Sequence, residues 1–279
     1  AIEIDPKFAM AYASLGRSYG DTWESTLAAQ NITKAYQLRN RASDRERFFI
    51  TLSYDLQVIG NLEKARRMGE LWAQTYPRDR DAHALLSGIY QAFGQYEKGA
   101  QEGKLSIEAD SNFPPGYANL AWAYVFLGRF SEAGNVIQQA TKRKFEFPDL
   151  ILLPYYIGFL NGDSGGMERQ VTLARDRPGA EDWLSNAQAF VLASAGHLQA
   201  ARTMSRRAAG IAQQGGQKER VAMFEAGAAV REAFFGNAND AGRSARAALA
   251  LSSARDVEYG AAFAAAISCA ACRPGETAF

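Results

Sequence analysis

The stretch Gly60-Asn-Leu-Glu-Lys-Ala65 decides the fold, because two similar stretches follow it at a fixed interval. They are Gly94-Gln-Tyr-Glu-Lys-Gly99 and Gly128-Arg-Phe-Ser-Glu-Ala133, and the first glycines of the three stretches lie 34 residues apart. Three later glycines extend the series, the last after a gap of 40 residues: Gly162, Gly196 and Gly236. A period of 34 residues with this content is typical of a helix-turn-helix unit that is stable only when it is stacked on its neighbours.

Apolar residues on both sides of each turn recur with spacings of three and four, which indicates pairs of amphipathic helices and not strands. First helices are predicted at 7–20, 44–59, 80–93, 114–127, 148–161, 182–195, 219–235 and 256–271. Second helices are predicted at 24–41, 62–76, 96–109, 130–143, 165–176, 198–213 and 239–251. The additional residues before Gly236 are assigned to a longer loop at 213–217. The pattern therefore predicts an all-α protein, an α-solenoid of stacked antiparallel helix pairs.

Large and small residues occupy matching positions in the first helices, where a small residue lets the neighbouring helix approach. The sets are Tyr12, Leu15, Gly16 and Tyr19; Phe49, Leu52, Ser53 and Leu56; His83, Leu86, Ser87 and Tyr90; and Tyr117, Leu120, Ala121 and Tyr124. The matching small residues of the second helices are Ala65, Gly99 and Ala133. This pattern resembles the tetratricopeptide repeat family closely over residues 1–143, with degenerate repeats at 144–251 and a truncated half-repeat at 252–279. The resemblance implies a single right-handed superhelical array that binds a protein or peptide partner in its concave groove.

Two segments, Tyr36–Phe48 and Glu70–Asp79, resemble the tetratricopeptide region that follows bacterial serine/threonine protein kinases, notably those of acidobacteria. Residues 178–182 and 235–238 are similar to later parts of such regions. The resemblance implies the regulatory region of a kinase, although such arrays also follow cyclases and winged-helix regulators. The region itself is expected not to be an enzyme, since the kinase HRD and DFG motifs are absent from its sequence. The chain lacks an initiator Met and stops where a second helix should begin, so we expect a segment of a longer protein.

The charge and hydropathy of the chain bear on its partners. A net charge of +1 argues against a dedicated nucleic-acid binder. Residues 202–255 hold nine Lys and Arg against four Asp and Glu, which we interpret as a solvated helix face, with an anion-binding patch as the alternative. No run of 18 apolar residues occurs, so membrane contact is expected only through an upstream segment. The localisation stays open between the cytoplasm and, for a membrane-spanning parent, the outside.

The chemical motifs of the chain are weak. Gly162-Asp-Ser-Gly-Gly166 matches a hydrolase elbow, but a helix is predicted before it and its first glycine falls on the repeat count, so we do not expect Ser164 to be catalytic. His83 occupies a packing position. Cys269 and Cys272 form a lone pair of cysteines that we interpret as small core residues, with a disulfide left open. No metal or cofactor is predicted.

The residue two positions after the packed leucine of each first helix is expected to face the concave wall. This position and its neighbours hold an unusual number of aromatic rings, with Arg and Gln beside them, which is the composition of peptide-binding hot spots. The predicted partner-binding groove comprises Arg17, Arg47, Tyr54, Gln57, Gln91, Trp122, Phe126, Tyr156, Phe159 and Phe190. An extended peptide or a helix is the expected ligand, because the Lys and Asn pairs of a carboxylate clamp are missing. Two alternatives stay open: burial of the rings against the next repeat, and self-association of the array.

Overall fold

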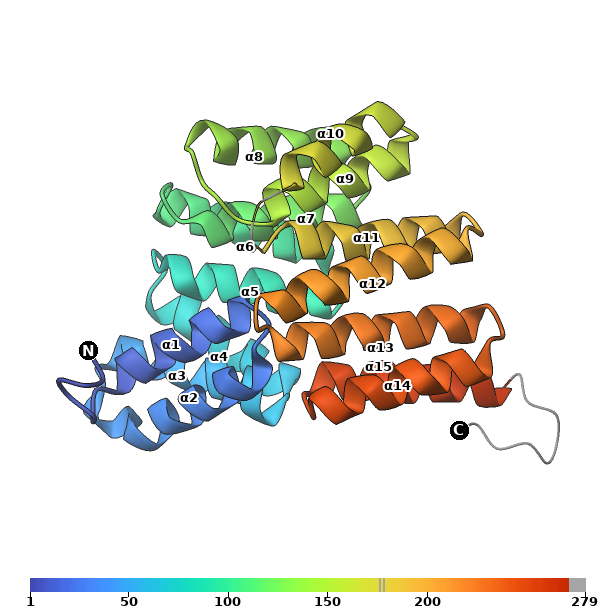
Figure 1. Cartoon of the computed structure of the whole chain (residues 1–279). Helices are drawn as coiled ribbons and strands as arrows, with labels where there is room; N and C mark the ends of the chain where they lie inside the picture. Colours follow the sequence, from blue (N-terminus) through green and yellow to red (C-terminus); the bar gives the residue numbers. More distant parts are fainter. Residues whose placement is uncertain (176, 178, 271–279) are drawn as a thin grey trace. The chain divides into compact units, whose positions relative to one another are not determined.

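The computed structural model of the chain describes residues 1–175, 177 and 179–270, and within these ranges it contains helices and turns but no strand (Figure 1). The all-α prediction is therefore confirmed. The chain divides into two compact units, with the boundary between Ile157 and Gly158. The predicted single array over residues 1–279 stays a prediction.

The first unit consists of helix pairs in which each α-helix packs on the next one. Its helices are α1 (Ala9–Asp21), α2 (Ser25–Leu38), α3 (Asp44–Ser53), α4 (Leu62–Thr75), α5 (Arg80–Ala92), α6 (Tyr96–Ala109), α7 (Pro114–Phe126), α8 (Phe130–Lys142) and α9 (Asp149–Asn161), the last of which crosses the boundary. Two short segments extend α2 and α3: the 3-10 turn η1 (Arg39–Arg41) and the π-helical segment η2 (Tyr54–Ile59). These bounds agree with the predicted ones to within two residues.

The second unit continues the pairs with α10 (Ser164–Ala174), α11 (Glu181–Ser194), α12 (Leu198–Gln214), α13 (Lys218–Phe234), α14 (Ala238–Leu251) and α15 (Arg255–Ala270). The longer loop predicted at 213–217 is wrong. Helices α12 and α13 are 17 residues long each, and only 215–217 separate them, so the additional residues lengthen the helices. Burial of Ala212 near the end of α12 gives the last turn of that helix a packed side.

The turn glycines have the conformation that the repeat requires. Gly60, Gly94 and Gly128 have φ angles of 71°, 69° and 70°, in the left-handed region where a Cβ is unfavourable. Gly162 follows α9 with a φ of 70°. In the first pair the same left-handed position falls to Trp23, with a φ of 65°, so this turn stores backbone strain that the glycine turns do not.

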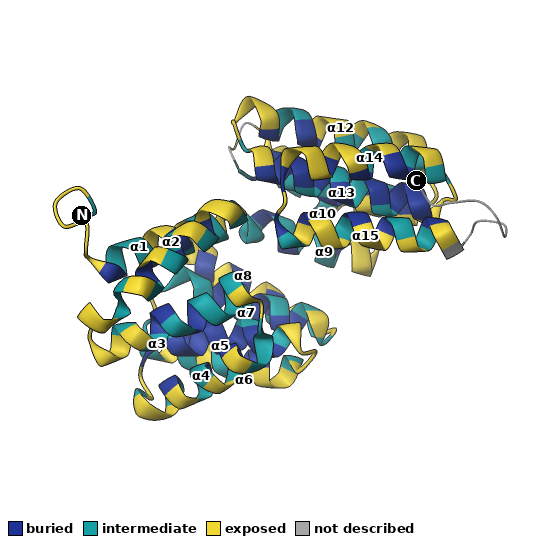
Figure 2. Ribbon diagram, turned by 90° about the horizontal axis from the view of Figure 1, so that it is seen from below, coloured by how far each residue is buried: buried dark blue, intermediate teal, exposed yellow. Residues whose placement is uncertain are grey.

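The small residues of the second helices are buried at the contacts between helices, as the repeat pattern requires. Ala65 and Ala133 are fully buried, and Gly103 lies against Leu120 of α7 so closely that an added Cβ would be 3.1 Å from the Leu120 Cα atom. Buried residues lie between the helices of each unit, while exposed ones cover the outer surfaces (Figure 2). The core is thus a series of close helix contacts, each dependent on a missing side chain.

One interpretation from the sequence is corrected at the end of α15. Cys269 is exposed and is a free thiol, so it is not a core residue. Cys272 lies outside the described residues. None of the helices in the described part of the chain has the length and apolar character to cross a membrane.

Candidate functional site

A row of aromatic rings in the first unit joins the first helices of two consecutive pairs. Trp122 of α7 and Tyr156 of α9 have ring centroids 6.1 Å apart. Phe126, one turn after Trp122, stacks on it at 5.6 Å, and Tyr96 at the start of α6 stacks on Phe126 at 5.0 Å. We call Tyr96, Trp122, Phe126 and Tyr156 the aromatic surface.

The aromatic surface is partly open to solvent. Phe126 is 50% exposed, and the other three rings are of intermediate exposure. A half-exposed phenylalanine in a ring stack leaves apolar area in water that a ligand would cover. The stack also fixes the position of each ring, so a ligand would lose little side-chain entropy on binding here.

The orientation of Trp122 is held by Asp149, the first residue of α9. The indole N–H donates a 2.6 Å hydrogen bond to the Asp149 Oδ1 atom. Burial raises the pKa of the Asp149 carboxyl above its ordinary value, and the hydrogen bond from Trp122 offsets part of that rise. The carboxyl therefore acts as a positioning group that connects α9 to the ring row.

Tyr54 and Gln57 lie in the π-helical segment η2. The Tyr54 ring stacks on Tyr36 of α2 at 3.9 Å and joins the core cluster that includes Ile50, so its ring face is covered by its own chain. The Gln57 side chain lies close to Gly20, 3.1 Å from the place of an added Cβ. Segments of π-helix are frequent at functional sites, but here the segment places Tyr54 in an intramolecular stack.

Gln91, Arg17 and Arg47 make local contacts. The Gln91 amide donates to the Asn119 carbonyl oxygen at 3.1 Å and so connects α5 to α7. Arg17 pairs with Asp21 at 2.9 Å, and Arg47 pairs with Asp44. Both arginines thus have a carboxylate on their own helix, which reduces the charge available to an acidic ligand.

The last two residues of the predicted groove belong to the second unit. Phe159 is 38% exposed and Phe190 is 42% exposed. The Arg231 guanidinium lies 4.4 Å from the centre of the Phe190 ring. Of the ten predicted residues, Trp122, Phe126 and Tyr156 are those that the structure brings together in one row.

Sequence reasoning missed two members of this site. Tyr96 lies at the start of a second helix, outside the column from which the groove was predicted. Asp149 was not considered because its contact with Trp122 spans 27 residues. Only the turn copy Gly94–Gly99, in which Tyr96 is an exposed aromatic residue, offered a signal.

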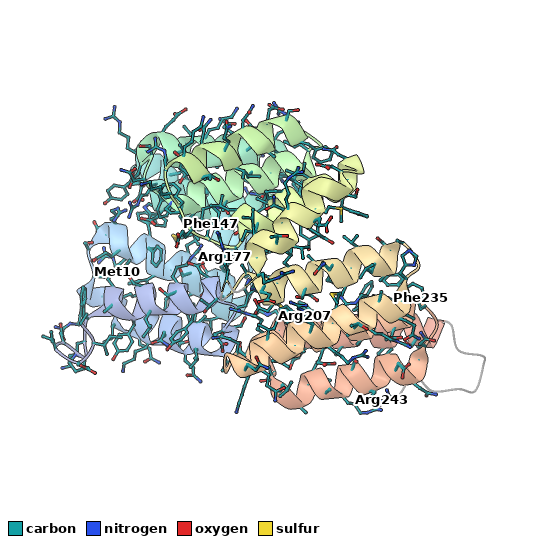
Figure 3. All side chains as sticks on the ribbon, turned by 45° about the horizontal axis from the view of Figure 1, so that its top comes forward. Met10, Phe147, Arg177, Arg207, Phe235 and Arg243 are labelled. Atoms are coloured by element: carbon teal, nitrogen blue, oxygen red, sulfur yellow. The ribbon has the colours of Figure 1, made fainter. Side chains whose placement is uncertain are left out.

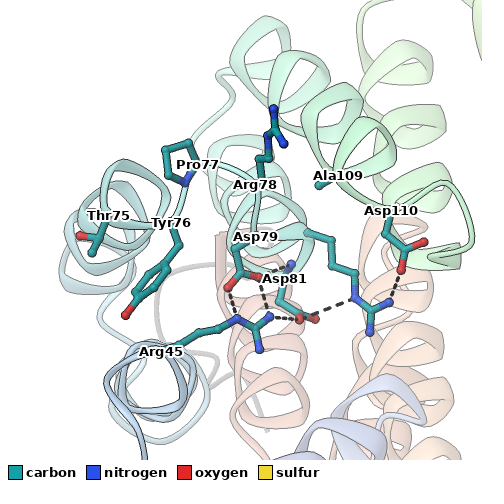
Figure 4. A pocket seen from close by; sticks show the side chains of 10 residues that line it. Arg45, Thr75, Tyr76, Pro77, Arg78, Asp79, Asp81, Ala109 and Asp110 are labelled. Carbon is teal, nitrogen blue, oxygen red and sulfur yellow. Dashed lines mark hydrogen bonds and ion pairs between the residues drawn. The ribbon is translucent and has the colours of Figure 1, made fainter.

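The largest pocket of the first unit, with a volume of about 760 Å³, is lined by charged residues at the loops between pairs (Figure 4). Arg45 donates to both carboxylate oxygens of Asp79, at 2.5 and 2.9 Å, and to Asp81 at 3.2 Å. Arg80 pairs with Asp110 in the same way across the next junction. These charges neutralise one another between consecutive repeats, which indicates a structural junction.

The elbow-like segment forms a turn between helices. Asp163 precedes α10 and its side chain accepts a 2.8 Å hydrogen bond from the Gly166 backbone N–H, while Ser164 is the first residue of the helix. Both ring nitrogens of His83 are engaged, by the Glu102 carboxylate and the Pro77 carbonyl. Within the described residues, no group of three or more His, Cys, Asp or Glu side chains could hold a metal ion.

Comparison with known proteins adds information on the fold. No protein-family model matches the chain, and no curated protein sequence matches it significantly. Among solved structures, a tetratricopeptide repeat protein from Parabacteroides merdae is similar over 92% of this chain and 98% of its own, with a TM-score of 0.52 and 10% identity. The APC/C hetero-tetramer Cut9–Hcn1 contains a chain that is similar over 99% of this chain and 55% of its own, with a TM-score of 0.58 and 13% identity.

These likenesses concern the fold alone, because the identities are low. They agree with the helix pairs, the turn glycines and the small residues at the helix contacts. The chain has the helical-repeat fold seen in tetratricopeptide repeat proteins.

Proposed function

We propose that this chain is a protein-interaction module whose first unit binds an extended peptide segment of a protein partner across the aromatic surface. The observation that carries the proposal is the contact between Trp122 and Tyr156, which joins the first helices of consecutive pairs into one row with the half-exposed Phe126. Stacked repeats present such rows along an extended surface, where successive side chains of a peptide can bind.

The aromatic surface has the properties of a binding hot spot. Aromatic rings bury a large area at a small entropic cost, and they dominate the energetics of interfaces. Asp149 fixes the indole of Trp122 before any ligand arrives, which reduces the cost of ordering on binding. The similar fold in the hetero-tetramer of Cut9 and Hcn1 supports a role in protein assembly.

We also propose that the module is the regulatory region of a bacterial serine/threonine protein kinase. This part of the proposal is supported by the resemblance of Tyr36–Phe48 and Glu70–Asp79 to the repeat regions of such kinases. The complete reading frame tests it directly. A kinase domain upstream is the expected result, and a cyclase or a winged-helix domain in that place would replace the kinase assignment.

The peptide-binding proposal is tested with random peptides displayed on phage and selected against the immobilised wild-type chain. Synthetic copies of the selected peptides are then titrated against Phe126→Ala. Because Phe126 is half exposed, its removal should leave the far-ultraviolet circular dichroism unchanged while it weakens binding at least about tenfold.

Phe8→Ala is the matched control, since Phe8 is 44% exposed in the same unit and lies outside the aromatic surface. Its binding should equal that of the wild type. The double variant Trp122→Ala/Tyr156→Ala should abolish binding. Equal affinity of the selected peptides for the wild type and for Phe126→Ala would overturn the proposal.

Self-association is a second candidate function, favoured by one observation in the second unit. Phe234 of α13 and Phe263 of α15 are 67% and 54% exposed, and their rings meet at 6.1 Å. An exposed ring pair is apolar area that a second copy could cover. Sedimentation equilibrium of the wild type and of Phe234→Ser/Phe263→Ser tests this candidate, and a monomer at all concentrations of the wild type would exclude it.

A further inference from the structure

A polar pocket in the second unit lies between the second helices α12 and α14, with α13 contributing the residues between them. Its volume is about 360 Å³. The charged and hydroxyl-bearing residues that line it are Arg202, Arg206, Arg231, Arg243, Glu225, Glu232, Asp240, Ser205 and Ser244. It belongs entirely to the second unit and is independent of the aromatic surface.

The more buried charges of this pocket compensate one another. Arg202 donates to both oxygens of Glu232, at 2.6 and 2.7 Å, and to Asp240 at 2.9 Å. The Glu232 side chain is 8% exposed, so this ion pair is largely shielded from solvent. Arg231 donates to the Ser205 hydroxyl at 2.7 Å. This inner network holds the three helices together and leaves little charge for a ligand.

The outer guanidinium groups have weaker contacts. Arg206 is exposed, and its 3.3 Å hydrogen bond goes to the neutral hydroxyl of Thr203, which does not compensate its charge. Arg243 pairs with Asp240 at 2.9 Å, but its side chain is 74% exposed and Asp240 is shared with Arg202. Figure 3 labels Arg243 on α14 and Arg207 on α12, two arginines that give these helices an exposed basic character. The rim of the pocket is therefore positive.

Glu225 restricts the ligand further. Its carboxylate lines the same pocket and would repel a simple anion such as phosphate. A peptide differs from phosphate because its backbone N–H groups can donate to Glu225 while its side-chain carboxylates approach the arginines. A site with rim guanidiniums and one carboxylate acceptor thus fits acidic side chains on a peptide backbone.

We propose that this pocket binds an acidic segment of a protein partner, with carboxylates on Arg206 and Arg243 and a backbone N–H on Glu225. The proposal goes beyond the aromatic surface, because it assigns a second ligand of different chemistry to the second unit. It also assigns a role to the basic excess of residues 202–255. The contact is electrostatic and exposed, so affinity should fall as salt rises.

The experiment titrates the full chain with three probes: a peptide of alternating Glu and Ala, the same peptide with Lys in place of Glu, and inorganic phosphate. Binding is measured by isothermal titration calorimetry at low salt and again at about 0.5 M salt. The Glu peptide should bind at low salt, and the Lys peptide and phosphate should not. Arg206→Ala/Arg243→Ala should weaken the Glu peptide about tenfold.

Arg169→Ala is the matched control, since Arg169 is 70% exposed in the same unit, pairs with Asp163 and lies outside the pocket. It should bind the Glu peptide as the wild type does. Glu225→Gln should weaken the Glu peptide and allow phosphate to bind. Phosphate binding to the wild type as tight as that of the peptide, or an equal loss in Arg169→Ala, would overturn the proposal. Peptide binding of Phe126→Ala should be unchanged here, which separates this site from the aromatic surface.

Discussion

The imidazole of His83 lies against the carboxylate of Glu102, with 2.6 Å between the His83 Nδ1 atom and the Glu102 Oε2 atom. The other ring nitrogen faces the Pro77 carbonyl oxygen at 3.0 Å. A neutral imidazole donates from one nitrogen only, so two acceptors on opposite sides favour the doubly protonated ring. The contact connects α5 to α6 and to the loop before α5.

The first prediction concerns pH. Burial lowers the pKa of His83, but the Glu102 carboxylate, the Pro77 carbonyl and the charge of Asp79 outweigh it, so the pKa is raised above 6.5. A raised pKa means that the stabilisation is complete below the pKa of the unfolded chain, near 6.5, and is lost as pH rises through the folded value. Urea unfolding of the wild type from about pH 6 to about pH 9 should therefore show falling stability.

The His83→Gln variant should lose this pH dependence, because Gln cannot take up the proton. His197→Gln removes the other histidine of the chain, which is exposed, and should keep the dependence. A wild-type slope that persists in His83→Gln would show that another group carries it.

The second prediction concerns the junction at Asp79. This carboxylate is 5% exposed, accepts from the Trp72 indole at 3.0 Å and from Arg45, and caps α5 through the Asp81 backbone N–H at 3.0 Å. Asp79→Ala removes all of these contacts and leaves the buried indole N–H without its acceptor. We expect the free energy of unfolding to fall by about 2–4 kcal/mol in urea.

Asp44→Ala provides the comparison for Asp79→Ala. Asp44 pairs with Arg47 within one helix and its side chain is 71% exposed, so its loss should cost at most about 1 kcal/mol. Similar losses for the two variants would mean that the buried junction contributes no more than a surface ion pair.

The third prediction compares two helix glycines. An added Cβ at Gly103 would lie 3.0 to 3.2 Å from the Cβ, Cα and N atoms of Leu120, and a backbone cannot yield as a flexible side chain does. Gly103→Ala should lower the free energy of unfolding by about 1–3 kcal/mol. At Gly134 in α8 an added Cβ meets nothing within 4 Å, so Gly134→Ala should raise it by about 0.5–1 kcal/mol.

Thermal and urea unfolding of both variants measure these opposite signs. If Gly103→Ala also stabilised the protein, the helix contact between α6 and α7 would be less close than the structure shows.

The helices could be predicted from the sequence because the repeat fixes them twice, by apolar spacing and by the turn glycine. The helix predicted at 80–93 is found at Arg80–Ala92. The loop at 213–217 was wrong for a physical reason: a polar run with two glycines lacks apolar spacing, yet Ala212 is buried and extends α12 to Gln214. Local composition did not show that long-range contact.

The site was less predictable than the fold. The column rule identified Trp122 and Tyr156, because equivalent positions of consecutive first helices are neighbours in space. It could not show that Tyr54 stacks on Tyr36, since that contact depends on the π-helical segment η2, nor that Tyr96 reaches Phe126 from a second helix. Ring contacts between helices depend on rotamers, and the repeat period does not specify them.

The last prediction separates a binding role of Gln91 from a structural one. Its amide donates to the Asn119 carbonyl at 3.1 Å, and the Asn119 amide donates in turn to the Ala84 carbonyl at 2.8 Å, so α5 and α7 are joined by reciprocal hydrogen bonds. Gln91→Ala should lower the free energy of unfolding by about 1 kcal/mol and leave the affinity for the selected peptides within about twofold. Gln91→Glu should destabilise at least as much, because a carboxylate cannot donate to the Asn119 carbonyl. Unchanged stability in Gln91→Ala together with a large loss of peptide affinity would instead place Gln91 in the binding groove, as the column rule predicts.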